Sequence, residues 1–471
     1  MTDILEAPPA APSAWSTIRE ALRGSHQDFT EGSIGRAVVL LAIPMVLEMV
    51  MESIFAVTDM FFVSRLGANS VAAVGLTESV LSLVYAIAMG ISMGVTALVA
   101  RRIGEKDHDA ASHSAAQGIL LGGSMALILG AIGVILAPKL LGVMGASPAV
   151  IAAGSGYTRV ILGGDATVVL LFVLNAAFRG AGDPSIAMRV LWIANGINII
   201  LGPCFIFGLG PFPHLGVTGA AVATTIGRGT GAILAFSAMV RPGGRLRVRL
   251  RQFIPDRHLL GQLVTLGSSA SLQFLVGTAS WIGLTRLLAT FGSEAVAGYT
   301  VALRMVIFAI LPAWGLANAA ATMVGQGLGA HKPDRAERAV WTACRYNFAF
   351  LTCLGVIFLI GAPTIASFFG HDPVMTGYAV RCLRIIAAGF PLYAFGMVLT
   401  QAFNGAGDTW TPTWLNFLIF WCWEIPLAWV LAKPLGFGSN GAFIAIAVAF
   451  STLAGAAAIV FRRGTWKAAV V

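Results

Sequence analysis

Apolar stretches long enough to cross a lipid bilayer recur along almost the whole chain, and they restrict its fold more than any other feature. Of the 471 residues, 57% are hydrophobic and only 11% are charged, which is outside the usual range of water-soluble domains. A membrane helix needs about 20 consecutive apolar residues, whereas a barrel strand needs about 10 residues of alternating polarity. The sequence therefore predicts an all-α integral membrane protein with about twelve transmembrane helices. The expected spans are 36–63, 70–100, 115–137, 155–178, 187–209, 215–240, 259–290, 295–325, 338–362, 378–403, 412–433 and 440–461.

Basic residues are concentrated in alternate connections between these spans. One set of connections holds Arg101, Lys106, Arg179 and the basic segment that begins at Arg241, while the other set holds few. Cytoplasmic loops are enriched in Lys and Arg, so both tails, 1–35 and 463–471, are predicted to lie in the cytoplasm, with the protein in the inner (plasma) membrane. The net charge of +9 then reflects topology, and no nucleic-acid partner is expected.

The sequence lacks the patterns that would indicate an enzyme or a bound cofactor. Its seven histidines fall in tails or loops, so the bundle offers no histidine ligands for a metal or a haem. The spacings of its five cysteines match no metal or disulfide framework, and no GxxxxGK[ST] phosphate-binding loop occurs. We expect no enzymatic activity and no cofactor.

The chain contains two copies of one unit. The motif FRGAGDP begins at Phe178 and returns as FNGAGDT at Phe403, at an offset of 225 (403 − 178 = 225). The same offset relates Gly67 to Gly292, Gly90 to Gly315 and Gly104 to Gly329. In each motif, the aspartate after the glycines is predicted to cap the next helix rather than to help bind a phosphate.

This duplication predicts the domain organisation. Each copy holds about six helices, and an even number returns the chain to the same side, so the two repeats should be parallel. We expect an N-lobe at 36–240, a basic linker at 241–258 and a C-lobe at 259–462. The predicted architecture is therefore two six-helix bundles around a central cavity whose access alternates as the lobes rock.

The first predicted span contains three carboxylates, Glu48, Glu52 and Asp59. At 100° per residue they lie at about 0°, 40° and 20° around the helix axis, so they share one face. An ionised carboxylate near the bilayer centre costs about 2.5–3.5 kcal/mol on insertion scales. The acidic face should therefore point into the protein or into water.

The second copy does not repeat these acids. At the repeat offset their counterparts are Gln273, Gly277 and Leu284. An acidic trio present in one copy only favours a task specific to that lobe, and we hypothesise that the task is coupling to protons or another cation. The alternative is that Glu48 and Glu52 are structural partners of buried arginines or backbone donors.

Further polar and soft apolar residues are candidates for a substrate cavity. Glu78 lies in the second span and Glu424 in the eleventh, while Met51 belongs to the segment MVLEMVM. Methionine and aromatic surfaces adapt to flat organic cations, although core packing uses the same residues. With Gln273, these three residues form the cavity set that the sequence nominates.

The order of several motifs resembles the multidrug and toxic compound extrusion (MATE) transporters. These motifs are TDMFFVSRLG at the end of the first span, then RGAGDP, NIILGPCFIFGLG, GSEAVAGYTVALRM and NGAGDT. The similarity extends from about Gly35 to Arg463. It implies a twelve-helix antiporter that expels organic cations and other amphipathic drugs by using an inward gradient of protons or sodium ions.

The resemblance also implies which residues couple the ion. The family's first-helix acid matches Asp59, and its N-lobe polar residues match Asn175, Asn198 and Thr224. Glu48 and Glu52 join this ion-coupling set as additional candidates.

Two departures from the family pattern favour protons over sodium. The fifth-helix acid of the family is replaced by Gly202, and the C-lobe acids of the sodium-driven branch are replaced by Gly277 and Tyr393. Tyr393 is therefore added to the cavity set. We expect a monomer in membrane lipid that carries small cationic or amphipathic substrates. A sodium-coupled exporter and a lipid-linked saccharide flippase of the related superfamily are the alternatives.

Overall fold

The computed structural model describes residues 13–25, 27–367 and 372–469, and its regular structure there is helical. The first half contains α1 (Ala14–Arg23), α2 (Ile34–Ser64), α3 (Ala68–Gly104), α4 (His108–Val143), α5 (Pro148–Gly163), α6 (Asp165–Gly180), α7 (Pro184–Phe207) and α8 (Val217–Val240). The connection and the second half contain η1 (Leu250–Phe253), α9 (Arg257–Leu288), η2 (Ala289–Phe291), α10 (Ser293–Gly329), α11 (Pro333–Ser367), α12 (Pro373–Ala406), α13 (Trp410–Asn416), η3 (Phe417–Glu424), α14 (Ile425–Ala432), α15 (Ser439–Arg462) and η4 (Thr465–Ala468).

The helices account for the predicted membrane spans. Among the described residues, eleven segments are long and apolar enough to cross a membrane. The pair α5 and α6 forms one of them, and α13 with α14 forms another. The helix α8 is also 24 residues long but carries Gly, Thr and Arg228 among its apolar residues, which lowers its hydropathy. With α8 the number of spans is about twelve, so the predicted fold class is confirmed.

The two repeated GAGD turns begin helices in slightly different ways. Asp408 lies one residue before Thr409, the N-cap of α13, and its carboxylate accepts bonds from the backbone nitrogen of Thr411 (3.2 Å) and from the Thr411 hydroxyl (2.7 Å). Asp183 is itself the N-cap of α7 and accepts the Ser185 hydroxyl, at 2.8 Å. Asp408 therefore bonds an amide of the first turn from just outside the cap position, whereas Asp183 occupies the cap position and its side chain bonds no helix amide among the described residues.

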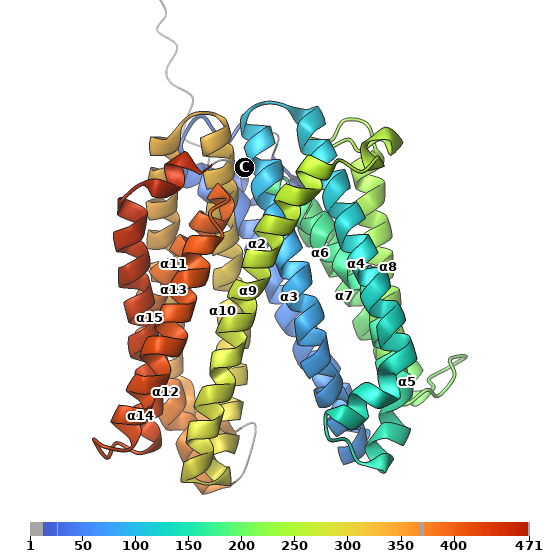
Figure 1. The fold of residues 1–471 in the computed structure, drawn as a ribbon, viewed down its shortest axis with the longest axis vertical. Helices are drawn as coiled ribbons and strands as arrows, with labels where there is room; N and C mark the ends of the chain where they lie inside the picture. The colour runs from blue at the N-terminus through green and yellow to red at the C-terminus, as the bar shows by residue number, and fades with distance from the viewer. Residues whose placement is uncertain (1–12, 26, 368–371, 470–471) are drawn as a thin grey trace, which may run out of the picture.

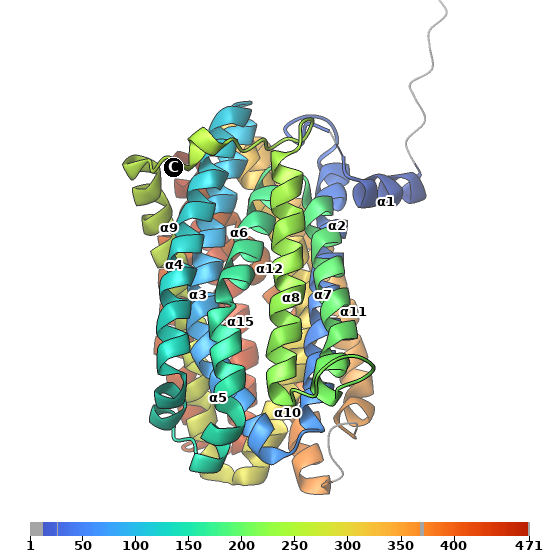
Figure 2. The same ribbon diagram turned by 90° about the vertical axis from the view of Figure 1, so that its right-hand side faces the viewer.

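The helices form two bundles that stand side by side. One bundle, the N-lobe, contains α2 to α8, and the other, the C-lobe, contains α9 to α15 (Figure 1). The ribbons of the lobes lie close together at the end that carries α1 and the C-terminal residues, called here the termini end, and they diverge toward the opposite, far end (Figure 1). The short helix α1 lies across the other helices at the termini end (Figure 2).

Glycines that mark the sequence repeat are the points where the lobes approach most closely. A Cβ on Gly90 of α3 would collide with Gly267 and Ser271 of α9, and a Cβ on Gly315 of α10 would collide with Met45 of α2. The pair Gly104 and Gly329 is equivalent, since a Cβ on either would meet the backbone of the opposite lobe, at Gln326 and Arg101 respectively. Helix backbones can pack this closely in a membrane only where side chains are absent.

Hydrogen bonds reinforce this contact at the termini end. The Thr322 hydroxyl and the Gln326 amide, both on α10, donate to the carbonyl oxygens of Arg179 and Gly180 at the end of α6, each at 3.0 Å. The Arg101 guanidinium of α3 donates to the carbonyl oxygen of Ala469. The lobes are therefore joined at the termini end.

Candidate ion-coupling and substrate site

The acidic face of α2 turns into the N-lobe, and its first acid is neutralised there. Glu48 is 2% exposed, and its Oε1 lies 2.7 Å from Nη1 of Arg179 at the end of α6. The Asn175 side-chain amide, one turn earlier on α6, donates to the same oxygen at 3.4 Å. Asn175 is thus brought to an acid of α2. Burying a carboxylate requires such a partner, because an uncompensated charge in a low-dielectric interior is strongly unfavourable.

The second acid is neutralised by a different helix. Oε1 of Glu52 lies 2.6 Å from Nη2 of Arg228 on α8, and Oε2 of Glu52 accepts the Asn195 amide of α7 at 3.1 Å. The Arg228 guanidinium also lies over the Phe55 ring, with 5.1 Å between its Cζ and the ring centroid. For Glu48 and Glu52, the structure therefore supplies the arginine partners that the alternative hypothesis requires.

Asp59 differs from the other two acids of α2. Within the described part of the chain it has neither an ion pair nor a hydrogen bond, although its charge interacts with those of Glu78 and Arg228. Glu78, on the first half of α3, is likewise without an ion pair among these residues and lies within electrostatic range of Arg304. Asp59 and Glu78 are therefore brought near each other as two carboxylates that lack the fixed arginine contacts of Glu48 and Glu52.

The polar pair expected on α7 and α8 is assembled. The Asn198 amide donates to the Thr224 hydroxyl at 2.8 Å, and Asn198 is 4% exposed. Gly202 lies one turn further along α7, where an added Cβ would meet only Oδ1 of Asn198, at 3.9 Å. There is thus room for a side chain at the position where the family pattern has an acid.

Of the residues proposed for the substrate cavity, the structure brings Tyr393 within electrostatic range of Glu424 in the C-lobe, but it does not bring the whole set together. Met51 and Gln273 are buried, at 8% and 6% exposure, and Oε1 of Gln273 has no hydrogen-bond partner in the described residues. Tyr393 stacks on Phe450 at 4.1 Å between ring centroids, inside the C-lobe. Glu424 is also buried in the C-lobe, at 2% exposure. Glu78 lies across the molecule in the N-lobe.

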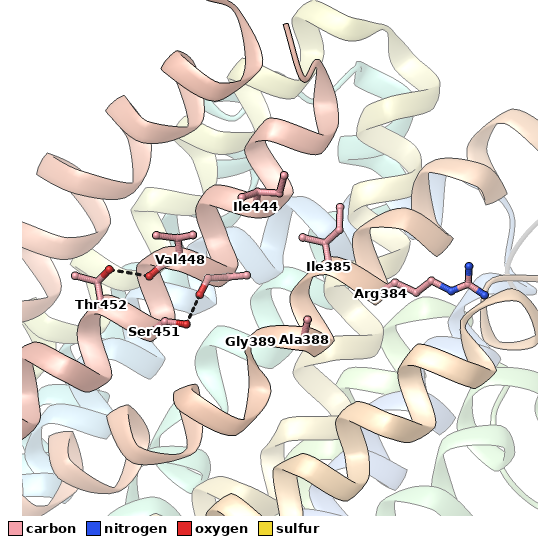
Figure 3. A pocket seen from close by; sticks show the side chains of 9 residues that line it. Arg384, Ile385, Ala388, Gly389, Ile444, Val448, Ser451 and Thr452 are labelled. Carbon is pink, nitrogen blue, oxygen red and sulfur yellow. Dashed lines mark hydrogen bonds between the residues drawn. The ribbon is translucent and has the colours of Figure 1, made fainter. Parts of the chain in front are cut away.

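A pocket of about 720 Å³ lies along the seam of α12 and α15. It is lined by Arg384, Ile385, Ala388, Gly389, Ile444, Ala447, Val448, Ser451 and Thr452, which include none of the cavity set (Figure 3). The hydroxyls of Ser451 and Thr452 bond the carbonyl oxygens one turn back on their own helix, and the Arg384 guanidinium points away from the pocket (Figure 3). The lining is mainly apolar and includes no carboxylate that could couple a cation.

Sequence reasoning misses the partners of the acids more than the acids themselves. The charge pattern assigns Arg179 to a cytoplasmic connection, yet its side chain ends inside the protein on Glu48. Asn195 is not among the predicted site residues, although it lies one turn before Asn198 on the same helix. A search for polar residues on the inner faces of α6 and α7 would have found both Arg179 and Asn195.

Among the described residues, no three His, Cys, Asp or Glu side chains come together in a way that could hold a metal ion.

A multi-pass bundle made of two repeated lobes, with acids turned into one lobe, is an architecture typical of membrane transporters. Comparison with known proteins identifies its family. The MatE family model matches the chain twice, at residues 44–204 and 270–430, once in each lobe. The chain belongs to the MatE family of transporters.

Individual relatives agree with this assignment. The chain is 26% identical to a probable multidrug resistance protein, NorM, of Thermotoga maritima over 441 residues, which cover 92% of this chain and 93% of that protein. It is also 26% identical to an FAD transporter of Shewanella oneidensis over 371 residues, covering 79% and 82% of the two chains.

Solved structures extend the similarity to three dimensions. A MATE crystal structure in complex with MaL6 superposes with a TM-score of 0.87 at 27% identity, covering 96% of this chain and 99% of that one. A MOP superfamily transporter from Pyrococcus furiosus gives the same TM-score and identity over 96% and 98% of the chains. For that protein, a binding pocket of reverse polarity has been taken to suggest a different function.

Proposed function

We propose that this protein is a secondary active antiporter that exports organic cations or amphipathic drugs and is driven by proton influx through alternating access. It would work as a monomer in the inner membrane, with the termini end in the cytoplasm. In that orientation, the contacts between the lobes at Gly104 and Gln326 keep the cytoplasmic side shut. The diverging helices then face outward (Figure 1), and this conformation is the one that would release substrate and take up protons.

One observation carries the proposal. Of the three carboxylates on the inner face of α2, only Asp59 has no ion pair among the described residues. A carboxylate held by a close arginine stays ionised, whereas an unpaired one can gain or lose a proton as its surroundings hydrate. Asp59 is therefore the member of the stripe whose charge can follow the transport cycle.

The driving force is sufficient for useful export. Moving one proton inward across 100 mV contributes about 2.3 kcal/mol, and a pH gradient adds to this. Since 1.4 kcal/mol corresponds to about a tenfold ratio, one proton per cycle sustains a concentration ratio above ten for an uncharged substrate. Exchange of one proton for one monovalent cation moves no net charge, so the pH gradient alone drives it.

Efflux of ethidium from liposomes tests the proposal. Purified protein should extrude ethidium when an inward proton gradient is imposed, and Asp59→Asn should abolish this gradient-driven efflux. Thr58→Val is the matched control, because Thr58 lies beside Asp59 and its hydroxyl donates to the Ile54 carbonyl oxygen of its own helix, at 2.7 Å. Transport by Asp59→Asn at the wild-type rate would contradict the assigned role.

The same assay separates the alternatives. A sodium gradient imposed at equal pH on both sides should drive no efflux, and transport on sodium alone would replace proton coupling by sodium coupling. Because one relative is named an FAD transporter, FAD should be included as a competitor. Scrambling of a labelled lipid-linked saccharide, without ethidium efflux, would favour the flippase alternative.

A further inference from the structure

Glu424 is a buried carboxyl group of the C-lobe that no described residue neutralises. It ends the π-helical segment η3 and is 2% exposed. Its Oε2 has no hydrogen-bond partner, and it enters no ion pair among the residues that the structure describes. This environment contrasts with those of Glu48 and Glu52, each of which touches an arginine.

Close packing contacts show which N-lobe residue corresponds to Glu424. Gly219 of α8 packs on the carbonyl carbon of Phe205 of α7, and Gly441 of α15 packs in the same way on the carbonyl carbon of Leu431 of α14. The loops that follow α7 and α14 show the same equivalence. In the N-lobe the backbone nitrogen of Leu215 donates to the carbonyl oxygen of Phe205, at 2.9 Å, and in the C-lobe that of Phe437 donates to the carbonyl oxygen of Leu431, at 3.1 Å. Phe205 and Leu431 are therefore equivalent, at an offset of 226 (431 − 205 = 226).

The same offset places Glu424 at the position of Asn198 (424 − 226 = 198). The repeated turns at Asp183 and Asp408 have an offset of 225 (408 − 183 = 225), so the C-lobe helix contains one extra residue before Glu424. A π-helical segment accommodates one extra residue within an α-helix, and Phe417–Glu424 is such a segment. This extra residue explains why the offset of 225 found in the sequence does not pair Asn198 with Glu424.

The partner of Asn198 is lost in the C-lobe. Asn198 donates to the Thr224 hydroxyl, at 2.8 Å. The last helix of each lobe is α8 or α15, and the equivalent glycines Gly219 and Gly441 give these two helices an offset of 222 (441 − 219 = 222). The counterpart of Thr224 is therefore Ile446, which is 4% exposed. The positions of a neutral hydrogen-bonded pair in one lobe are thus occupied in the other lobe by a carboxyl group and an apolar residue.

The surroundings of Glu424 contain hydroxyls but no paired cation among the described residues. Tyr299 of α10 and Tyr393 of α12 lie within electrostatic range of it, and the Tyr299 hydroxyl is itself buried without a partner in the described residues. Cys382 interacts with Tyr299 in turn. The elements that contact η3, together with α10 and α12, which carry the two tyrosines, have these remaining charged or titratable groups: Arg257, His258 and Arg286 of α9, Arg462 of α15, Cys422 of η3 itself, Glu294 and Arg304 of α10, and Tyr378, Arg381 and Arg384 of α12.

None of these cations contacts Glu424. The Arg462 guanidinium lies over the Trp341 ring, the Arg384 guanidinium donates to the Leu359 carbonyl oxygen, and the Arg304 guanidinium donates to the Met60 sulfur. Gly283 of α9 packs on Ile425, but Arg286, one turn further, is exposed and forms no ion pair in the described part of the chain.

A carboxylate buried in a membrane bundle without a cation or donors is too unfavourable to persist in its ionised form, so the group must carry a bound positive charge. We propose that Glu424 is a proton-binding site of the C-lobe and holds a proton on its carboxyl group in this outward-facing arrangement. The proton would leave when movement of the lobes admits water to η3. The inference deepens the proposed function, on which its role in transport rests, by adding a second site in the lobe that lacks the acidic stripe.

Infrared spectroscopy of the purified protein in lipid tests the site without any transport. Wild type should show a carboxylic acid C=O band that shifts in D₂O and weakens as the buffer is made alkaline, and Glu424→Gln should lose this contribution. Glu424→Asp should retain a shifted band and keeps the test valid if the glutamine variant folds poorly. Glu294→Gln, an exposed glutamate in the first turn of α10, is the matched control and should leave the band unchanged.

A second measurement links the site to the cycle. Ethidium binding in weakly buffered solution should release fewer protons from Glu424→Gln than from wild type or Glu294→Gln. A carboxylic band of equal intensity in wild type and Glu424→Gln would overturn the inference even if proton-driven efflux occurs. Conversely, absence of proton-driven efflux in wild type would refute the proposed function, while the band would still decide whether Glu424 binds a proton.

Discussion

The two lobes derive from one repeated unit, yet the first two acids of α2 and the buried acid of the C-lobe are compensated differently. In the N-lobe, Glu48 and Glu52 touch Arg179 and Arg228, at 2.7 and 2.6 Å. In the C-lobe, Glu424 is as buried as Glu48 and touches no cation among the described residues. A paired carboxylate ties helices together and keeps its charge, whereas an unpaired one is free to change it. The difference indicates which acids hold the fold and which can respond to a proton.

The largest effect is expected from breaking the Glu48 pair. Arg179→Gln should lower the free energy of unfolding by about 3–5 kcal/mol, because it leaves a buried carboxylate uncompensated. Thermal and denaturant unfolding in detergent measure the loss. The double variant Glu48→Gln with Arg179→Gln should recover much of it, since no charge is then left unpaired. Equal destabilisation of the single and double variants would show that the pair does not matter as a pair.

A smaller loss is expected at Glu52, whose side chain is 24% exposed. Arg228→Gln should cost about 1.5–3 kcal/mol, the usual range for a hydrogen bond to a charged group, since Asn195 and nearby solvent still stabilise the carboxylate. Arg228→Lys keeps the charge but not the fork geometry and should fall between this variant and wild type. If Arg228→Gln proved as costly as Arg179→Gln, partial exposure would not be what separates the two pairs.

The neutral pair Asn198 and Thr224 should contribute less than either ion pair. Thr224→Val should cost about 0.5–1.5 kcal/mol, the typical net value of one hydrogen bond. A double-mutant cycle with Asn198→Ala isolates the bond, and a coupling energy near zero would show that the two side chains act independently. Thr225→Val is a neighbouring control, because the Thr225 hydroxyl bonds the Ala221 carbonyl oxygen on its own helix, at 2.9 Å.

The smallest effect is expected at an acid outside the membrane spans. Partial burial raises the pKa of Asp28, but hydrogen bonds from Thr30 and the charges of Lys106 and Lys332 outweigh it and hold the pKa below its usual value. A lowered pKa stabilises the fold above the unfolded-state pKa, and this contribution is lost as the pH falls through the folded-state pKa. Asp28→Asn should therefore cost at most about 1 kcal/mol at neutral pH and progressively less in acid, as measured by thermal unfolding across a pH series. A difference that grew in acid would contradict this sign.

Much of the fold could be predicted because the bilayer restricts it so strongly. The apolar spans, about twelve in number, and the glycine landmarks at Gly90, Gly104, Gly315 and Gly329 are visible in the sequence, and the structure shows that these glycines lie at contacts between the lobes. The partners of the acids were not predictable. Arg179 reaches Glu48 from 131 residues away, and nothing in either segment's sequence reports that proximity.

The sequence by itself determined the class of fold, its duplication and the presence of acids in a membrane helix, because length, polarity and repetition are local properties of the chain. Only the tertiary structure decided which acid meets an arginine and which is left alone, since charge compensation depends on side chains brought together from different helices. The π-helical segment illustrates the point: one extra residue moves Glu424 onto the position of Asn198, and that correspondence emerges only when packing contacts are compared.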